Sequence, residues 1–110
     1  MPTEKEILAA ELEAAVKQKL KITWDNEKTN VEVKRMIANA KISLGEKIAL
    51  AKDDKDIFEN EGSEQQLFLD YCLYIWNNVA DQFERNYAAS ILQLRIKHEG
   101  GPYDKEIQDV

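Results

Sequence analysis

Apolar residues recur at every third or fourth position through most of this chain, the spacing that places them on one face of an α-helix. Thr3 and Glu6 form a capping-box pattern, in which each side chain can hydrogen bond to the backbone N–H of the other residue. The apolar residues that follow lie four apart: Leu8, Leu12, Val16 and Leu20. We therefore predict a surface helix over about residues 3–20.

A second apolar stripe follows a polar loop, residues 21–30, which contains turn-forming residues. Its members are Val33, Met36, Ile37, Ala40, Leu44 and Ile48. Thr29 and Glu32 repeat the capping-box pattern, so this helix is expected to begin at Thr29 and to end near Ala49. Because glycine disfavours helix interiors, an earlier end with Gly45 as the left-handed cap is the alternative.

The acidic segment that follows, residues 50–62, has no helical period and is expected to be a long loop. Ile57 and Phe58 are apolar, so we expect each side chain to be buried in the core or covered by a partner. Loops of this length are unusual in a small bundle and often contact a partner or move. Two readings stay open: Phe58 closes the end of the core, or this pair of residues contacts another molecule.

The most apolar stretch is LFLDYCLYIW, residues 67–76, in which Asp70 is the one charged residue. Ser63 and Gln66 supply a third capping-box pattern before it. A helix that is apolar on all sides must be covered on all sides. This stretch is therefore either the central helix of the bundle or a helix whose outer face meets another subunit.

The four-residue apolar spacing continues beyond this stretch to about His98. Its members are Val79, Phe83, Tyr87, Ile91 and Leu94. One helix over residues 63–98 would be about 53 Å long, which is more than a chain of this size needs. Asn77 and Asn78 are poor helix formers, so we expect a break there that gives two coaxial or kinked halves.

These elements predict an all-α fold, a small bundle of three to four helices with a long C-terminal helical region. The two prolines, Pro2 and Pro102, lie outside the periodic segments. A chain of 110 residues fits one domain with a single modest core. We expect residues 1–99 to form that domain and residues 100–110 to form a short polar tail.

Charge narrows the class of protein. The formal net charge of −6 disfavours a general nucleic-acid binder. Residues 1–52 have a net charge of +2 and residues 53–110 a net charge of −8. Opposite signs suit contacts between copies of the chain or with a charged partner, although solvated helix faces explain the same counts. The sequence shows no secretory signal or membrane-spanning stretch, which favours a soluble intracellular protein.

The residues that could carry chemistry do not form a reactive set. The four glycines do not have the spacing of a phosphate-binding loop. Cys72 and His98 are the only residues of their kinds, so a disulfide within the chain and a Cys/His zinc site are excluded. We expect Cys72 to lie in the core and His98 to cap a helix end. The acidic residues at 53–61 do not match a calcium loop, so neither an enzyme nor a metal or cofactor protein is expected.

Two stretches carry a resemblance to a known family. The first contains Lys21-Ile22-Thr23-Trp24-Asp25 between two helices. The second contains Asp56-Ile57-Phe58-Glu59, Phe68-Leu69-Asp70-Tyr71-Cys72, Trp76-Asn77-Asn78, Phe83-Glu84 and Asn86-Tyr87. In this order, over about residues 8–98, the chain resembles the small helical head-tail connector proteins of long-tailed bacteriophages, also called head-completion or adaptor proteins.

The resemblance implies a structural role without catalysis or cofactor. Copies of the chain would form a homo-oligomeric ring below the portal protein, joining the DNA-filled capsid to the tail. The partners would be other copies, the portal, and the next connector or tail-completion protein. Genomic DNA would pass through the ring without sequence-specific binding, and no membrane would be involved. The protein would lie at the head-tail junction of the virion and in the host cytoplasm during assembly, in a phage or prophage.

Apolarity and position nominate seven residues for contacts with a partner or another subunit: Trp24, Ile57, Phe58, Tyr74, Trp76, Phe83 and Tyr87. Most of the aromatic residues also fit a core, and Trp24, on a loop, is the best single candidate for a contact. Two other functions stay open. One is a small helical regulatory module that binds another protein, and the other is a DNA-packaging accessory factor that uses the net-positive first half.

Overall fold

The computed structural model describes the backbone of residues 1–109 and every side chain in that range except those of residues 52, 53, 55 and 100–109. Within residues 1–109 the chain forms five α-helices and two 3-10 helices, with no strand. Their bounds are Glu4–Lys19 (α1), Glu27–Lys47 (α2), Lys52–Glu59 (η1), Ser63–Trp76 (α3), Ala80–Gln82 (η2), Phe83–Asn86 (α4) and Ala88–Asp109 (α5). The predicted all-α class is confirmed.

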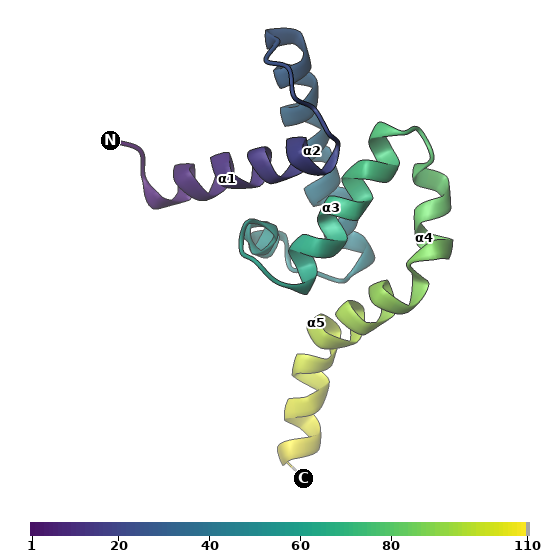
Figure 1. Cartoon of the computed structure of the whole chain (residues 1–110). Coiled ribbons are helices and arrows are strands. Elements are labelled where there is room, and N and C mark those ends of the chain that lie inside the picture. The colour runs from purple at the N-terminus through teal and green to yellow at the C-terminus, as the bar shows by residue number, and fades with distance from the viewer. Residues whose placement is uncertain (110) are drawn as a thin grey trace.

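α3 is the central helix of the fold (Figure 1). It contacts α1, α2, η1 and η2, and its residues Leu67, Phe68, Tyr71 and Cys72 are buried. The other apolar residues of the stretch are half-buried: Leu69, Leu73, Tyr74, Ile75 and Trp76. Of the two positions predicted for this stretch, the structure shows the central one. Contact of its outer side with another subunit stays a prediction.

Both ends of the chain project from this centre. α1 and α2 diverge from one another, and α5 runs away from α1 at the other end of the molecule (Figure 1). The Cα radius of gyration is 15.4 Å, compared with about 13 Å for a compact domain of this length. Leu12 is the first buried residue of α1, so the first two turns of that helix contribute nothing to the core.

One core joins α1, α2, η1, α3 and α4. Its most enclosed side chains are Leu12, Val16, Val33, Leu44, Ile48, Phe58, Phe68, Cys72 and Phe83. The rings of Phe58 and Phe68 stack with their centroids 4.9 Å apart. Burial of one such side chain stabilises the fold by about 1.5–3 kcal/mol. Phe58 thus closes the end of the core. The segment predicted as an irregular loop contains η1, which presents this residue.

The helix starts agree only in part with the capping-box predictions. Thr3 caps α1 as expected, since its hydroxyl accepts a hydrogen bond from the Glu6 backbone N–H at 3.2 Å. The prediction for Thr29 is wrong, because α2 is capped by Asn26, whose Oδ1 accepts from the Thr29 N–H at 3.2 Å. Asparagine is the stronger cap of the two.

The capping box predicted at Ser63 is also wrong. α3 begins at Ser63 itself, after Gly62, and no side chain caps its first turn. Glu64 lies in that first turn instead. A negative charge at this position is favoured by the dipole of the helix.

α1, α2 and α3 all end in the same way. The residue after each cap has a left-handed backbone: Lys21 with φ 61°, Ala49 with φ 60° and Asn78 with φ 62°. In each case the next N–H bonds back to the carbonyl five residues before it, as Leu50 does to Gly45 at 2.8 Å. This is the Schellman motif. The alternative end with Gly45 as the left-handed cap is wrong, because burial of Ile48 outweighs the roughly 1 kcal/mol cost of an internal glycine.

The break predicted after residue 76 is present, but its two sides are not coaxial. α3 ends with Asn77 as its cap, and the left-handed turn at Asn78 reverses the chain, so that η2 and α4 fold back along α3 (Figure 1). The helical stop predicted at Gly100 is wrong, since the α5 backbone continues to Asp109. The side chains of the predicted tail lie outside the described residues.

Ion pairs join the basic first half of the chain to its acidic second half. Four of them do so: Lys5–Asp56, Lys19–Asp70, Lys41–Glu59 and Lys47–Glu84. In each pair the lysine belongs to residues 1–52 and the carboxylate to residues 53–110. Part of the charge asymmetry is therefore satisfied within one chain, so the asymmetry by itself does not require a second copy.

Candidate interaction surfaces

Three of the seven nominated residues form an aromatic cluster inside the chain. Tyr74, Phe83 and Tyr87 pack together, with the Phe83 and Tyr87 ring centroids 4.7 Å apart and those of Tyr74 and Tyr87 5.5 Å apart. Tyr71 joins the cluster at 4.6 Å from Phe83. Asn86 Nδ2 also donates to the Tyr74 hydroxyl at 3.0 Å. These contacts hold α4 against α3 after the chain reversal.

The other four nominated residues are spread over the fold. Phe58 is fully buried, as is Phe83 of the cluster, so neither offers a surface to a partner in this conformation. Ile57 and Trp76 are half-buried. Trp24 is 52% exposed, and its Nε1 donates to the Thr29 hydroxyl at 3.1 Å. Of the seven, Trp24 alone is exposed.

Other large apolar side chains are exposed among the described residues, and three of them, Ile42, Leu92 and Ile96, belong to two distinct surfaces. Besides Trp24 and Met1, the exposed set is Ile7, Val31, Ile42, Leu92 and Ile96. The sequence contains a signal for them that the predictions did not use. Each is an apolar residue that lies off the buried stripe of its own helix, as Ile42 does between Leu44 and Ala40.

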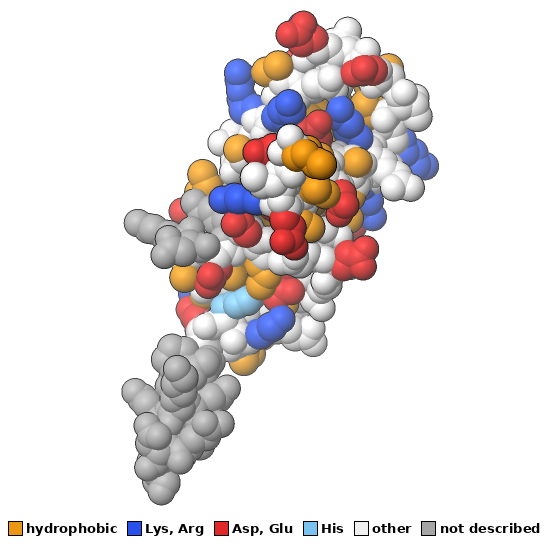
Figure 2. Space-filling view, turned by 90° about the vertical axis from the view of Figure 1, so that its left-hand side faces the viewer, with side chains coloured by type: hydrophobic (Ala, Val, Ile, Leu, Met, Phe, Trp, Pro, Cys, Tyr) orange, Lys and Arg blue, Asp and Glu red, His pale blue; other side chains and the backbone are white. Residues whose placement is uncertain are grey.

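The first surface is an open groove between the diverging helices α1 and α2, which we call the α1–α2 groove. Its volume is about 700 Å³. The apolar lining consists of Ala9, Ala10, Leu12, Ile37, Ala38 and Ile42. Glu6 and Glu13 lie along its α1 side, and Lys34 and Lys41 along its α2 side. On the face from which α1 begins, hydrophobic side chains gather between acidic and basic ones (Figure 2).

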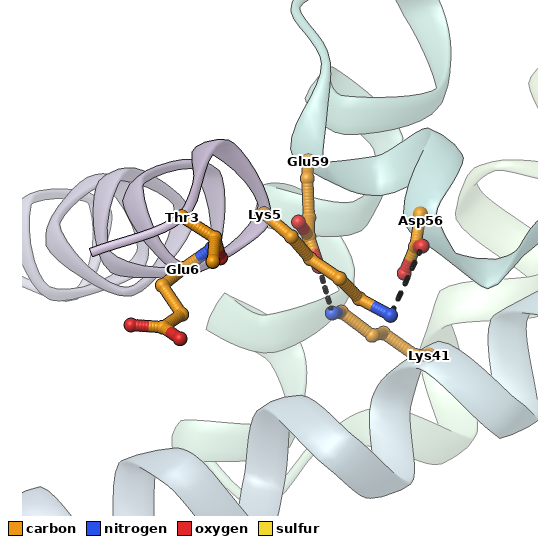
Figure 3. A network of polar contacts seen from close by, with 6 residues as sticks. All are labelled: Thr3, Lys5, Glu6, Lys41, Asp56 and Glu59. Carbon is orange, nitrogen blue, oxygen red and sulfur yellow. Dashed lines mark hydrogen bonds and ion pairs between the residues drawn. The ribbon is translucent and has the colours of Figure 1, made fainter. Parts of the chain in front are cut away.

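η1 ties the two sides of this groove together. Lys5 of α1 lies 3.8 Å from Asp56, and Lys41 of α2 donates to Glu59 at 2.8 Å (Figure 3). Glu59 is only 6% exposed, so solvent and salt screen its pair with Lys41 less than they screen the pair of Lys5 with Asp56. η1 thus contacts both helices within the single chain, firmly on the α2 side through the buried Glu59 and weakly on the α1 side, where Lys5 and Asp56 are exposed.

The second surface is the α5 stripe, formed by Leu92 and Ile96. They are 56% and 60% exposed and lie one helical turn apart. The opposite side of α5 carries the residues that pack on the body, among them Leu94, which is 8% exposed. The stripe thus faces away from the core.

α5 is attached to the first turn of α3 through a buried carboxylate. Glu64 is 5% exposed, and its Oε2 accepts from Lys97 Nζ at 2.7 Å. His98 Nε2 lies 3.2 Å from the same oxygen, without the geometry of a hydrogen bond. Burial alone would raise the pKa of Glu64, but the Lys97 hydrogen bond and the nearby positive charge lower it below its ordinary value. His98, predicted to cap a helix end, lies inside α5 and contacts Glu64.

The described residues contain neither a candidate metal site nor a candidate membrane-spanning helix. No cluster of three or more His, Cys, Asp or Glu side chains occurs among them. No helix in the described part of the chain is both long and apolar enough to span a bilayer. Burial raises the pKa of the Cys72 thiol to about 12. Comparison of the chain with family models, with curated proteins and with solved structures finds no match in any of the three.

Proposed function

We propose that this chain is a head-tail connector protein of a phage or prophage, which forms a homo-oligomeric ring below the portal and joins the capsid to the tail. The sequence resemblance over about residues 8–98 supports the class. The observation that carries the proposal is the presence of two different apolar surfaces, the α1–α2 groove and the α5 stripe, on separate parts of one chain.

A ring of identical subunits needs two different contact surfaces. In such heterologous assemblies each subunit offers one surface to the copy before it and another to the copy after it. An isologous dimer would need only one patch. The all-α fold, with helices projecting at both ends, supplies the separation between the two surfaces (Figure 1).

The mechanism is geometric and interfacial. The net charge of −6 suits a channel wall that does not retain DNA, because carboxylates that are not neutralised repel phosphates. Trp24 and the half-buried outer side of α3 are available for the portal or for the next connector. No catalytic step and no cofactor enters this function.

Light scattering on a sizing column tests the proposal, first with the chain alone over a wide concentration range and then with the portal encoded nearest to it. We expect either a ring of defined mass or co-elution with the portal. A stable monomer that does not co-elute with the portal would overturn the connector function. It would favour the helical protein-binding module, for which the open α1–α2 groove is the specific observation.

A further inference from the structure

The two apolar surfaces of this chain are complementary in shape. The α1–α2 groove is concave. Ala9, Ala10 and Ala38 line it with small side chains, which leave room for a side chain from another helix. The α5 stripe is convex, with two branched side chains one turn apart. A helix that places apolar residues at i and i+4 into an apolar groove is a common mode of recognition.

The two surfaces cannot meet within one chain. The groove lies between α1 and α2, whereas α5 runs away from α1 (Figure 1). Leu92 borders a surface pocket with Lys47 and Glu84, and Ile96 lies one turn farther along α5, while Leu94 and the Glu64 ion pair attach the opposite side of the helix. An α5 stripe that fills the groove must therefore belong to another copy of the chain.

The charges beside the two surfaces are complementary as well. Arg95 lies one turn after Leu92 on α5, and its half-exposed side chain forms a surface ion pair with Glu99 at 3.2 Å. Exposed pairs of this kind contribute little stability, so Arg95 can exchange this partner for another carboxylate. The α1 side of the groove carries Glu6 and Glu13. The Glu6 carboxylate turns away from the ion pairs that Lys5 and Lys41 make with η1 (Figure 3). It is therefore free to meet a cation that approaches with the stripe.

We propose that the α5 stripe of one copy docks into the α1–α2 groove of the next copy. Leu92 and Ile96 would lie beside Ile42, and Arg95 would exchange its surface pair with Glu99 for one with Glu6. This inference rests on the proposed function, because it names the contact that would join neighbouring subunits of the ring. Each subunit then gives one stripe and receives one, as a closed heterologous assembly requires.

Matched substitutions on α2 test the apolar part of this contact. Ile42→Asp places a charge in the groove, and Val31→Asp places one at an equally exposed position of the same helix outside it, since the two side chains are 46% and 49% exposed. We expect Ile42→Asp and Leu92→Asp each to weaken assembly by about thirtyfold or more, as loss of a central anchor does. Val31→Asp should assemble as the wild-type chain does. Circular dichroism establishes that each variant is folded.

A charge exchange tests the polar part. Arg95→Glu and Glu6→Lys should each weaken assembly, and the double variant should recover it, because the pair is restored in the opposite sense. Glu4→Lys, in the same first turn of α1 but outside the groove, is the control for the change in net charge. If the double variant assembles no better than the single variants, Arg95 and Glu6 do not pair.

Disulfide trapping tests the contact without loss of an apolar side chain. Chains carrying Ile42→Cys are mixed with chains carrying Leu92→Cys and oxidised. The native Cys72 is fully buried, so it does not compete. We expect a cross-linked dimer from the mixture and little from either variant alone. A dimer from Ile42→Cys alone would indicate a symmetric contact and overturn the proposal.

The outcomes separate this inference from the proposed function. If the wild-type chain forms a ring but the mixture does not cross-link and Ile42→Asp assembles normally, the docking contact is wrong and the connector function stands. If the mixture cross-links into dimers but the wild-type chain forms no closed ring and does not co-elute with the portal, the docking contact stands and the connector function fails. A chain that neither cross-links nor assembles overturns both.

Discussion

Three residues of this chain hold a backbone conformation that most side chains avoid. Lys21, Ala49 and Asn78 all have φ near +60°. A residue with a Cβ atom loses about 1–2 kcal/mol in this region, whereas asparagine adopts it more readily. The hydrogen bonds of the three Schellman motifs and the burial of nearby core residues offset this loss. The positions are therefore sites where a single change can stabilise the fold.

Replacement of Lys21 by glycine should stabilise the protein. Lys21 is exposed and its side chain makes no hydrogen bond or ion pair with a described residue, so Lys21→Gly removes strain without removing a described contact. We expect the free energy of unfolding, measured in urea, to rise by about 0.5–1 kcal/mol. This gain is the backbone strain that is relieved minus the larger conformational entropy that glycine loses on folding. Asn78→Gly is the matched control, with a smaller gain. A loss of stability in Lys21→Gly would contradict this account of the helix end.

At the scale of elements, one carboxylate adds an ion pair to the apolar attachment of α5 through Leu94. Glu64 is buried between Lys97 and His98, and its pKa is lowered in the folded chain. A carboxyl whose pKa falls on folding stabilises the fold fully at pH values above its ordinary value of 4.5. That stabilisation is lost as the pH falls through the lowered value.

Acidification should therefore loosen α5 through Glu64. We expect the free energy of unfolding of the wild-type chain to fall more steeply below pH 4.5 than that of Glu64→Gln, which has no carboxylate to protonate. At pH 7 Glu64→Gln should be the less stable of the two, because Lys97 loses its charged partner. Glu61→Gln, an exposed neighbour, serves as the control. Parallel pH profiles for wild type and Glu64→Gln would refute the assignment.

The positions of the helices could be predicted from the sequence, because apolar spacing decides which face is buried. The break after residue 76 could be predicted too, since Asn77 and Asn78 are poor helix formers. The direction of the chain after the break could not, because it depends on the left-handed turn at Asn78 and on the packing of Phe83 against Tyr71. Local propensity contains no information about such distant contacts.

The candidate surfaces were harder to predict than the fold. Apolarity nominated Phe58 and Phe83, but both are enclosed once η1 and α4 have folded onto α3. Ile42, Leu92 and Ile96 are exposed because they lie off the buried stripes, and a helical wheel of each predicted helix contains that signal. What it does not contain is the angle between α1 and α2, which opens the groove.

The whole molecule has a well-packed centre and two projecting ends. Amides of α3 around Phe68 and Cys72 lie among fully buried side chains, whereas the first turns of α1 have none. Local opening is least costly where few apolar contacts hold the backbone. The stability of the chain is therefore expected to fall from α3 towards both ends.

Hydrogen exchange should follow this gradient. In the single chain we expect the slowest exchange in the middle of α3, and fast exchange in the first two turns of α1 and in α5 after Leu94. In the assembled form the same two ends should become protected, since both belong to the proposed contact between copies. Uniform protection along α1 in the single chain would be inconsistent with this description.

The two ion pairs of η1 have a consequence for the strength of any contact in the groove. Binding loses affinity when flexible parts must be ordered at the moment of association. Here the buried pair of Lys41 with Glu59 holds η1 against α2, while Phe58 anchors η1 in the core. The inner part of the groove, at Leu12 and Ile37, is therefore preorganised, and the entropy of shaping it is lost during folding. An incoming helix has only the first turns of α1 left to order.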